Sequence, residues 1–179
     1  MAAGNNHGMR WLFVAAFVLV ACGGAPSEPA APRDVAMPLP PLTLPLFAGG
    51  TWTSTSARGS ALVIDVWASW CKPCGKAFPK LDALAARRSD IVIVAISIDE
   101  DPAAIRDFIT KFPLAVPIVQ DAEQVVTRSP LVIARLPTVL IVDRDQIIQH
   151  RLEEPSEDDY GHIEQLVDTV GSVPLKVEH

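Results

Sequence analysis

The chain has 179 residues, of which 49% are hydrophobic and 20% charged, and its formal net charge is −6 at pH 7. This length corresponds to one domain. Its lysines and arginines form no cluster along the chain. Phosphate binding needs a basic surface, so the composition excludes nucleic acid as an expected partner.

An apolar run at residues 11–21 follows Arg10 and is itself followed by small residues. This order is typical of a secretory signal. A membrane-spanning helix needs about 20 apolar residues, so a transmembrane anchor is the weaker alternative. We therefore expect residues 1–21 to be a signal peptide.

The end of this run, Leu-Val-Ala-Cys at residues 19–22, resembles the bacterial lipobox, in which a peptidase cleaves before a cysteine that carries lipid. On this interpretation Cys22 is the lipid anchor, which explains the odd count of three cysteines. An ordinary secretory signal, which would leave Cys22 free, is the alternative. Gly23 stands where an Asp often retains lipoproteins at the inner membrane, which favours the outer membrane.

Prolines recur among Ala, Ser and Gly as far as residue 41. This composition predicts a tether over residues 22–41, with partial polyproline II character. The folded domain is then expected at residues 42–179.

Strand and helix patterns alternate after the tether. A nearly continuous apolar run at residues 61–67 predicts a strand buried on both faces. Residues 73–88 have the spacing of a helix with one apolar face, and residues 91–98 form a second apolar run. Asp101 and Pro102 predict the start of an amphipathic helix.

The second half of the domain continues this alternation. A short strand is expected at residues 115–119 and a short helix at residues 122–128. Two strands, at residues 138–142 and 146–152, are joined by a polar turn, and Ser156 with Asp159 resembles the capping box of a last helix. This order predicts an α/β domain with a central mixed sheet flanked by helices.

Cys71 and Cys74 lie two residues apart, at the junction between the first apolar strand and the first helix. Sulfurs at this spacing can form a disulfide, and a helix N-terminus favours a thiolate on the first cysteine. Lys72 adds a nearby cation. Zinc would need two more ligands, but the sequence has no second CxxC and its four histidines have no ligand spacing. We therefore expect a redox pair and no metal.

Asp65 is a polar residue inside the predicted buried strand. A buried carboxylate is costly unless it is paired or used. One interpretation is a general acid/base that removes the proton of Cys74 through water, with a pKa raised by desolvation. The other is a strand-end residue that is solvated or bonded to a neighbour.

From about residue 42 to residue 170 the chain resembles the thioredoxin fold, and most closely its membrane-anchored TlpA-like and ResA-like branch. The resemblance rests on residues 65–74, on Pro79, and on Leu136-Pro137-Thr138, which is similar to the family's cis-proline segment. Residues 99–128 resemble the strand-helix insertion of this branch. The resemblance implies a thioredoxin fold with that insertion.

The same resemblance implies a thiol-disulfide oxidoreductase whose redox centre is a Cys71–Cys74 disulfide, with no organic cofactor. Cys71 would be the nucleophile and Cys74 the resolving thiol, with Asp65 as acid/base. A membrane electron donor would reduce the pair again after each turnover.

The resemblance also implies where substrates bind. Trp70, Lys72 and Pro73 would wall the site, while Trp67 is expected in the core. A cis bond before Pro137 would expose the backbone of Leu136 to an extended segment of a disulfide-containing protein. A trans bond at the end of a loop is the alternative, since few X–Pro bonds are cis.

Three positions depart from the pattern of the branch. Ala77 stands where many relatives carry Glu, so a role in cytochrome c maturation does not carry over. Gln146 replaces a common Gly in the last hairpin. Arg135 replaces a small residue two positions before Pro137, as either a cation beside the substrate groove or a solvated loop charge.

These observations predict a monomeric reductase of protein disulfides, held by lipid on the periplasmic side of a bacterial membrane. Pro73 resembles the residue found in reducing thioredoxins. The alternatives are an oxidase on the same fold and a chaperone that holds Cu(I) on Cys71 and Cys74. Copper-binding relatives usually space their cysteines by three residues and add a distant His. A peroxidase would need a Thr-x-x-Cys motif, which the sequence lacks.

Overall fold

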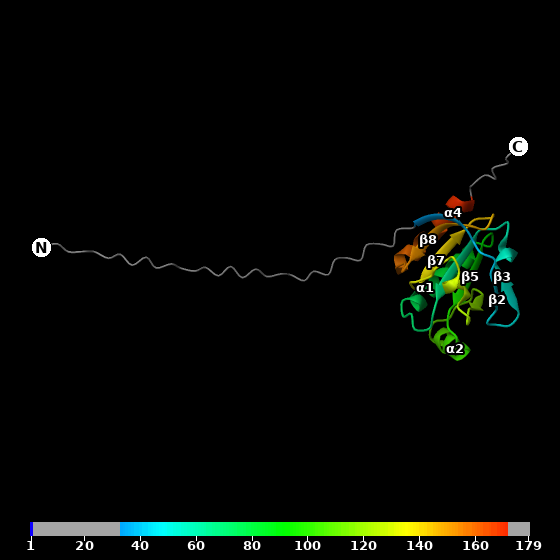
Figure 1. Cartoon of the computed structure of the whole chain (residues 1–179), viewed down its shortest axis with the longest axis horizontal. Coiled ribbons are helices and arrows are strands. Elements are labelled where there is room, and N and C mark those ends of the chain that lie inside the picture. The colour runs from blue at the N-terminus through cyan, green and yellow to red at the C-terminus, as the bar shows by residue number, and fades with distance from the viewer. Residues whose placement is uncertain (2–32, 172–179) are drawn as a thin grey trace, which may run out of the picture.

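A computed structural model describes Met1 and residues 33–171 (Figure 1). The predicted lipidation site Cys22 and nearly all of the predicted signal peptide lie outside the described residues. The elements of the first half are β1 (Arg33–Pro38), β2 (Thr43–Pro45), β3 (Thr51–Thr53), the 3-10 turn η1 (Ser54–Ala57), β4 (Leu62–Trp67), α1 (Cys74–Arg87) and β5 (Val92–Ser97). Those of the second half are α2 (Pro102–Lys111), β6 (Ile118–Gln120), α3 (Val125–Arg128), β7 (Thr138–Val142), β8 (Ile147–Glu153) and α4 (Glu157–Gly171).

Six strands form one mixed sheet in the order β1-β8-β7-β4-β5-β6. β4 pairs in parallel with β5 and antiparallel with β7, and β5 pairs in parallel with β6. β8 is antiparallel to both β7 and β1. Figure 1 shows the β2–β3 hairpin at the side of the sheet away from β8, where Leu46 forms a bridge to Val119 of β6. The predicted mixed sheet flanked by helices is confirmed.

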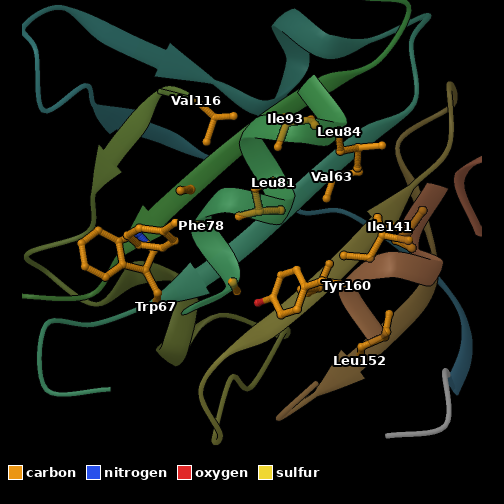
Figure 2. Packing of buried hydrophobic residues seen from close by; sticks show 14 of the residues in the cluster. Val63, Trp67, Phe78, Leu81, Leu84, Ile93, Val116, Ile141, Leu152 and Tyr160 are labelled. Carbon is orange, nitrogen blue, oxygen red and sulfur yellow. The ribbon is translucent and has the colours of Figure 1, made fainter. Parts of the chain in front are cut away.

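The two faces of β4 bury different side chains, which explains its continuous apolar sequence. Val63 and Trp67 join the core beneath α1 and α4, with Phe78 and Ile163 among its members. Residues of the other face, such as Ile64, pack in a second core with the hairpin and α3. In Figure 2, Trp67 and Phe78 lie at one end of the first core and Ile141 and Leu152 at the other.

The structure corrects the predicted start of the folded domain. Residues 33–38 were predicted to belong to the tether, but they form β1 at the edge of the sheet. An edge strand tolerates proline because one side of it needs no ladder hydrogen bonds. The register with β8 shifts between Asp34 and Met37, and Ala36 has a φ of 46°. Leu39 is also buried, so the folded region begins before residue 42.

The predicted helix caps are present. The Asp101 side chain accepts a hydrogen bond from the Ala103 N–H at 2.8 Å, at the start of α2. Asp159 accepts one from the Ser156 N–H at 2.7 Å, and Ser156 Oγ accepts one from the Asp159 N–H at 3.3 Å. Within residues 33–171, no helix combines the length and the apolar sequence that crossing a membrane requires.

Candidate active site

The two cysteines of the CxxC motif are joined by a disulfide, with their Cα atoms 5.5 Å apart. α1 begins at Cys74, so Cys71 lies just before the first turn, where unpaired N–H groups and the helix dipole favour a thiolate. Cys71 is 5% exposed and Cys74 is fully buried. The sulfur that is more accessible to a substrate is therefore also the one that the helix activates.

Asp65 lies in β4 and is completely buried. Its register partners in β5 and β7 are Ala95 and Val139, so neither neighbouring strand offers it a charge. Burial raises the pKa of Asp65 from 3.8 to about 7, although a hydrogen bond from Tyr160 opposes the rise. A carboxyl group with this pKa can accept and return a proton near neutral pH. The structure contradicts a solvated strand-end residue, while hydrogen bonding to a neighbour is observed.

That neighbour is Tyr160, which the sequence analysis did not single out. Its hydroxyl donates to Asp65 Oδ1 at 2.6 Å, and its ring is buried in the first core. Burial and the Asp65 carboxylate both raise the pKa of Tyr160 well above 10, so it remains a donor. The available signal was that the chain's single tyrosine lies three residues before Ile163 on the apolar face of the last helix.

The loop that leads into Cys71 is hydrogen-bonded to Asp99, which lies just after the end of β5. The backbone N–H and the hydroxyl of Ser69 both donate to the Asp99 carboxylate, at 2.8 and 2.7 Å. Ser97 Oγ donates to the same carboxylate at 2.7 Å. These bonds fix the segment that carries Trp70, whose side chain is 68% exposed beside the disulfide. Sequence reasoning assigned Asp99 no role at the site.

Aromatic side chains from α2 and from Phe112, the residue that follows it, support the first turn of α1. A Cβ atom added to Gly75 would lie 2.5 Å from the Phe112 ring, so the ring fits only against a glycine. Phe112 packs on Phe108 with ring centroids 4.9 Å apart, and Phe108 stacks on Trp67 at 5.2 Å. The predicted core position of Trp67 is confirmed. The insertion thus contributes packing directly next to Cys74.

The Leu136–Pro137 peptide bond is cis, as the resemblance implied. Within residues 33–171, no backbone hydrogen bond occupies the N–H or C=O of Leu136. The Pro137 carbonyl, in contrast, accepts from the Glu154 N–H at 2.8 Å. The exposed Arg135 forms an ion pair with Glu154 at 3.0 Å, so its charge is partly neutralised rather than free for a substrate.

The residues predicted to bind substrate divide into two groups. Trp70, Lys72 and Pro73 are exposed around the buried disulfide. Leu136 is half-buried and packs against both cores, while Pro137 is buried. Among the described residues, no three His, Cys, Asp or Glu side chains gather as a metal site.

Known proteins share both the sequence pattern and the fold. Residues 34–168 match the family model described as Redoxin. The chain belongs to the Redoxin family. The thiol-disulfide oxidoreductase ResA of Bacillus thuringiensis (strain Al Hakam) is 28% identical over 107 residues, which cover 56% of this chain and 61% of that protein. The protein of the same name from Geobacillus kaustophilus (strain HTA426) is 29% identical over 115 residues, which cover 61% of this chain and 64% of that protein.

Solved structures agree on the fold. A thiol-disulfide oxidoreductase from Bacteroides fragilis superposes with a TM-score of 0.61 at 25% identity, covering 72% of this chain and 98% of that chain. The thioredoxin domain of a thiol-disulfide oxidoreductase from Bacteroides vulgatus superposes with a TM-score of 0.65 at 21% identity, covering 75% of this chain and 99% of that chain. The thioredoxin fold and the ResA-like resemblance are thereby confirmed. This Redoxin-family chain spans about three fifths of the length of the curated relatives it matches.

The structure shows the surroundings of two departures from the family pattern. Ala77 is buried in α1, and its methyl group places no carboxylate at that position. Gln146 has a φ of 68°, in the left-handed region that favours glycine. Asp143 stabilises this turn, because its side chain accepts from the Asp145 and Ile147 N–H groups, both at 2.9 Å.

Proposed function

We propose that this Redoxin-family chain is a thiol-disulfide oxidoreductase that exchanges electrons with the disulfides of proteins. The observation that carries the proposal is the Cys71–Cys74 disulfide at the start of α1, with the buried Asp65 in the preceding strand β4. The relatives named thiol-disulfide oxidoreductase support it.

In the reducing direction, the Cys71 thiolate attacks one sulfur of the substrate disulfide. A mixed disulfide forms, and the first substrate sulfur leaves as a thiolate. Asp65 accepts the proton of Cys74, and the Cys74 thiolate attacks the Cys71 sulfur. The second substrate sulfur then leaves as a thiolate and takes up the proton that Asp65 returns, while the first substrate thiolate takes its proton from solvent. Two electrons have passed to the substrate, and a membrane electron donor reduces the Cys71–Cys74 disulfide again.

The exposed surface around the disulfide suits an extended protein segment as substrate. Trp70 offers an exposed aromatic face, and Lys72 and Pro73 lie between the cysteines. The backbone of Leu136 is available for strand-like pairing. A peptide bound in this way would have its disulfide directed at Cys71.

The direction of electron flow is tested by the reduction potential. Pairs on this fold range from about −270 mV in thioredoxin to about −120 mV in a strong oxidant. We expect a reduction potential nearer that of thioredoxin, about −270 mV, together with reduction of insulin by the dithiol form. A potential near about −120 mV, with oxidation of a reduced protein, would establish the oxidase instead. Tight Cu(I) binding without insulin reduction would establish the chaperone.

We further propose that the mature protein begins at a lipid-modified Cys22 and is held on the periplasmic side of a membrane, with the outer membrane favoured. The lipobox-like end of the apolar run supports this location. Mass spectrometry of protein from its bacterial host should find residues 1–21 removed and lipid on Cys22. The Cys22→Ala variant is the control and should no longer be found in the membrane fraction. Unmodified Cys22, or an intact signal, would contradict the anchor.

A further inference from the structure

The hydrogen bond between α4 and β4 joins two groups that are both shielded from solvent. Tyr160 is 5% exposed, and Asp65 is not exposed at all. The 2.6 Å distance is that of a strong hydroxyl–carboxylate hydrogen bond. Tyr160 lies in the first turn of α4, which the capping box of Ser156 and Asp159 holds in place. The hydroxyl is therefore presented from a fixed point.

This bond makes the two oxygens of the Asp65 carboxyl group inequivalent. Oδ1 accepts the Tyr160 hydroxyl, whereas Oδ2 has no hydrogen-bond partner among the described residues. A buried oxygen without a partner is costly, so its persistence calls for an explanation. A role for Oδ2 in receiving a transferred proton would explain why this oxygen has no permanent hydrogen-bond partner among the described residues.

We propose that Tyr160 is a positioning residue that holds Asp65 through Oδ1 and leaves Oδ2 as the oxygen through which the proton of Cys74 passes. The inference rests on the proposed disulfide exchange and deepens it. Tyr160 does not itself take up the proton, because it remains protonated.

The other groups around Asp65 give no competing stabilisation. The paired strands contribute Ala95 and Val139, which do not titrate. The first residue of α1, Cys74, and Cys71 just before the helix belong to the same core as Tyr160. Within residues 33–171, no lysine, arginine or histidine bonds to the carboxylate, and the Tyr160 hydroxyl is the group that lowers the pKa of Asp65 against burial. Removing that hydroxyl should therefore raise the pKa of Asp65 above about 7.

The test is the pH dependence of mixed-disulfide release in single turnover, comparing Tyr160→Phe with the wild type. Release should rise with pH as Asp65 ionises, and in the variant this rise should move to higher pH. If the pKa of Asp65 rises by one unit, release should become about tenfold slower near pH 6 and stay nearly unchanged near pH 9. Ile163→Val, a change in the same buried face of α4, is the packing control and should keep the wild-type midpoint.

A second measurement keeps the native packing. Because the chain has a single tyrosine, fluorotyrosine incorporation labels only position 160. The fluorine resonance should titrate with the ionisation of Asp65, and this response should disappear in Asp65→Asn. Fluorination makes the phenol a stronger donor, so the midpoint of release should move to lower pH, opposite to Tyr160→Phe.

The outcomes separate this inference from the proposed function. If Asp65→Asn slows release while the pH profiles of Tyr160→Phe and the fluorinated protein match the wild type, Tyr160 is only structural and the inference fails. If Tyr160→Phe does not fold, the fluorinated protein alone decides. If the wild type exchanges no disulfides, the proposed function fails, yet the fluorine titration still reports whether Tyr160 senses Asp65.

Discussion

Cys71→Ser should reduce disulfide exchange to the uncatalysed rate, whereas Cys74→Ser should accumulate mixed disulfides on Cys71. Cys71 is the more accessible sulfur and lies before the N-terminus of α1, where a thiolate is stabilised. A serine hydroxyl at that position is protonated at neutral pH and cannot replace the thiolate. Cys74→Ser keeps the attacking group and removes only the thiol that releases the substrate.

Non-reducing electrophoresis and mass spectrometry after mixing each variant with a disulfide substrate distinguish the two outcomes. Both variants should also carry Cys22→Ala, so that a single thiol remains and every adduct is assigned without ambiguity. The double variant Cys71→Ser/Cys74→Ser in the same background is the control and should form no adduct. Adducts on Cys71→Ser but not on Cys74→Ser would reverse the two roles.

The central elements of the fold were predictable because their signals are local. The strand expected at residues 61–67 is β4 (Leu62–Trp67), and the helix expected at residues 73–88 is α1 (Cys74–Arg87). A strand buried on both faces needs a continuous apolar run, and a helix needs an apolar stripe. Both patterns can be recognised in a single sequence without knowledge of what packs against them.

The edges of the fold were not predictable in this way. β1 contains Pro38, and the β2–β3 hairpin consists of strands of three residues each, one of which ends at Pro45. Proline suggested a tether, but the outer side of an edge strand needs no N–H donor. β1 is a strand because it pairs with β8, and β2 is a strand because it pairs with β3 and buries Leu44; only the assembled fold provides these contacts.

The same distinction applies to the site. Cys71, Cys74 and Asp65 lie within ten residues of one another and form one motif. Tyr160 is 95 positions from Asp65, and Asp99 is 30 positions from Ser69. Such contacts depend on the arrangement of α4 and β5 around β4, so a single sequence shows the reacting groups but not the residues that orient them.

Asp65→Asn should remove a pH-dependent loss of stability while slowing the release of substrate. The folded protein raises the pKa of Asp65 from 3.8 to about 7, so it holds this proton more tightly than the unfolded chain does. Unfolding therefore releases a proton between these values, and the free energy of unfolding of the wild type falls as pH rises. Above the folded pKa the loss is complete, at about 4 kcal/mol for about three units.

The variant lacks this titration, so its stability should change less between about pH 4 and pH 8. Its Oδ1 still accepts the Tyr160 hydroxyl, but its buried amide donors lack partners, at a cost of roughly 1–3 kcal/mol that does not depend on pH. At about pH 8 the variant should thus be more stable than the wild type by roughly 1–3 kcal/mol, whereas toward pH 4 it should be less stable than the wild type by roughly 1–3 kcal/mol.

Denaturant melts of both oxidised proteins across this range measure the stability difference, because the disulfide removes thiol titration from the comparison. Single-turnover release of a mixed disulfide measures the effect on catalysis. Because the variant has lost its general base, its release rate should fall by about 100-fold or more. Parallel stability curves for the two proteins would show that Asp65 titrates normally in the folded state. Parallel curves together with unchanged release would exclude Asp65 from the proton path, because a buried base that titrates near neutrality must appear in at least one of the two measurements.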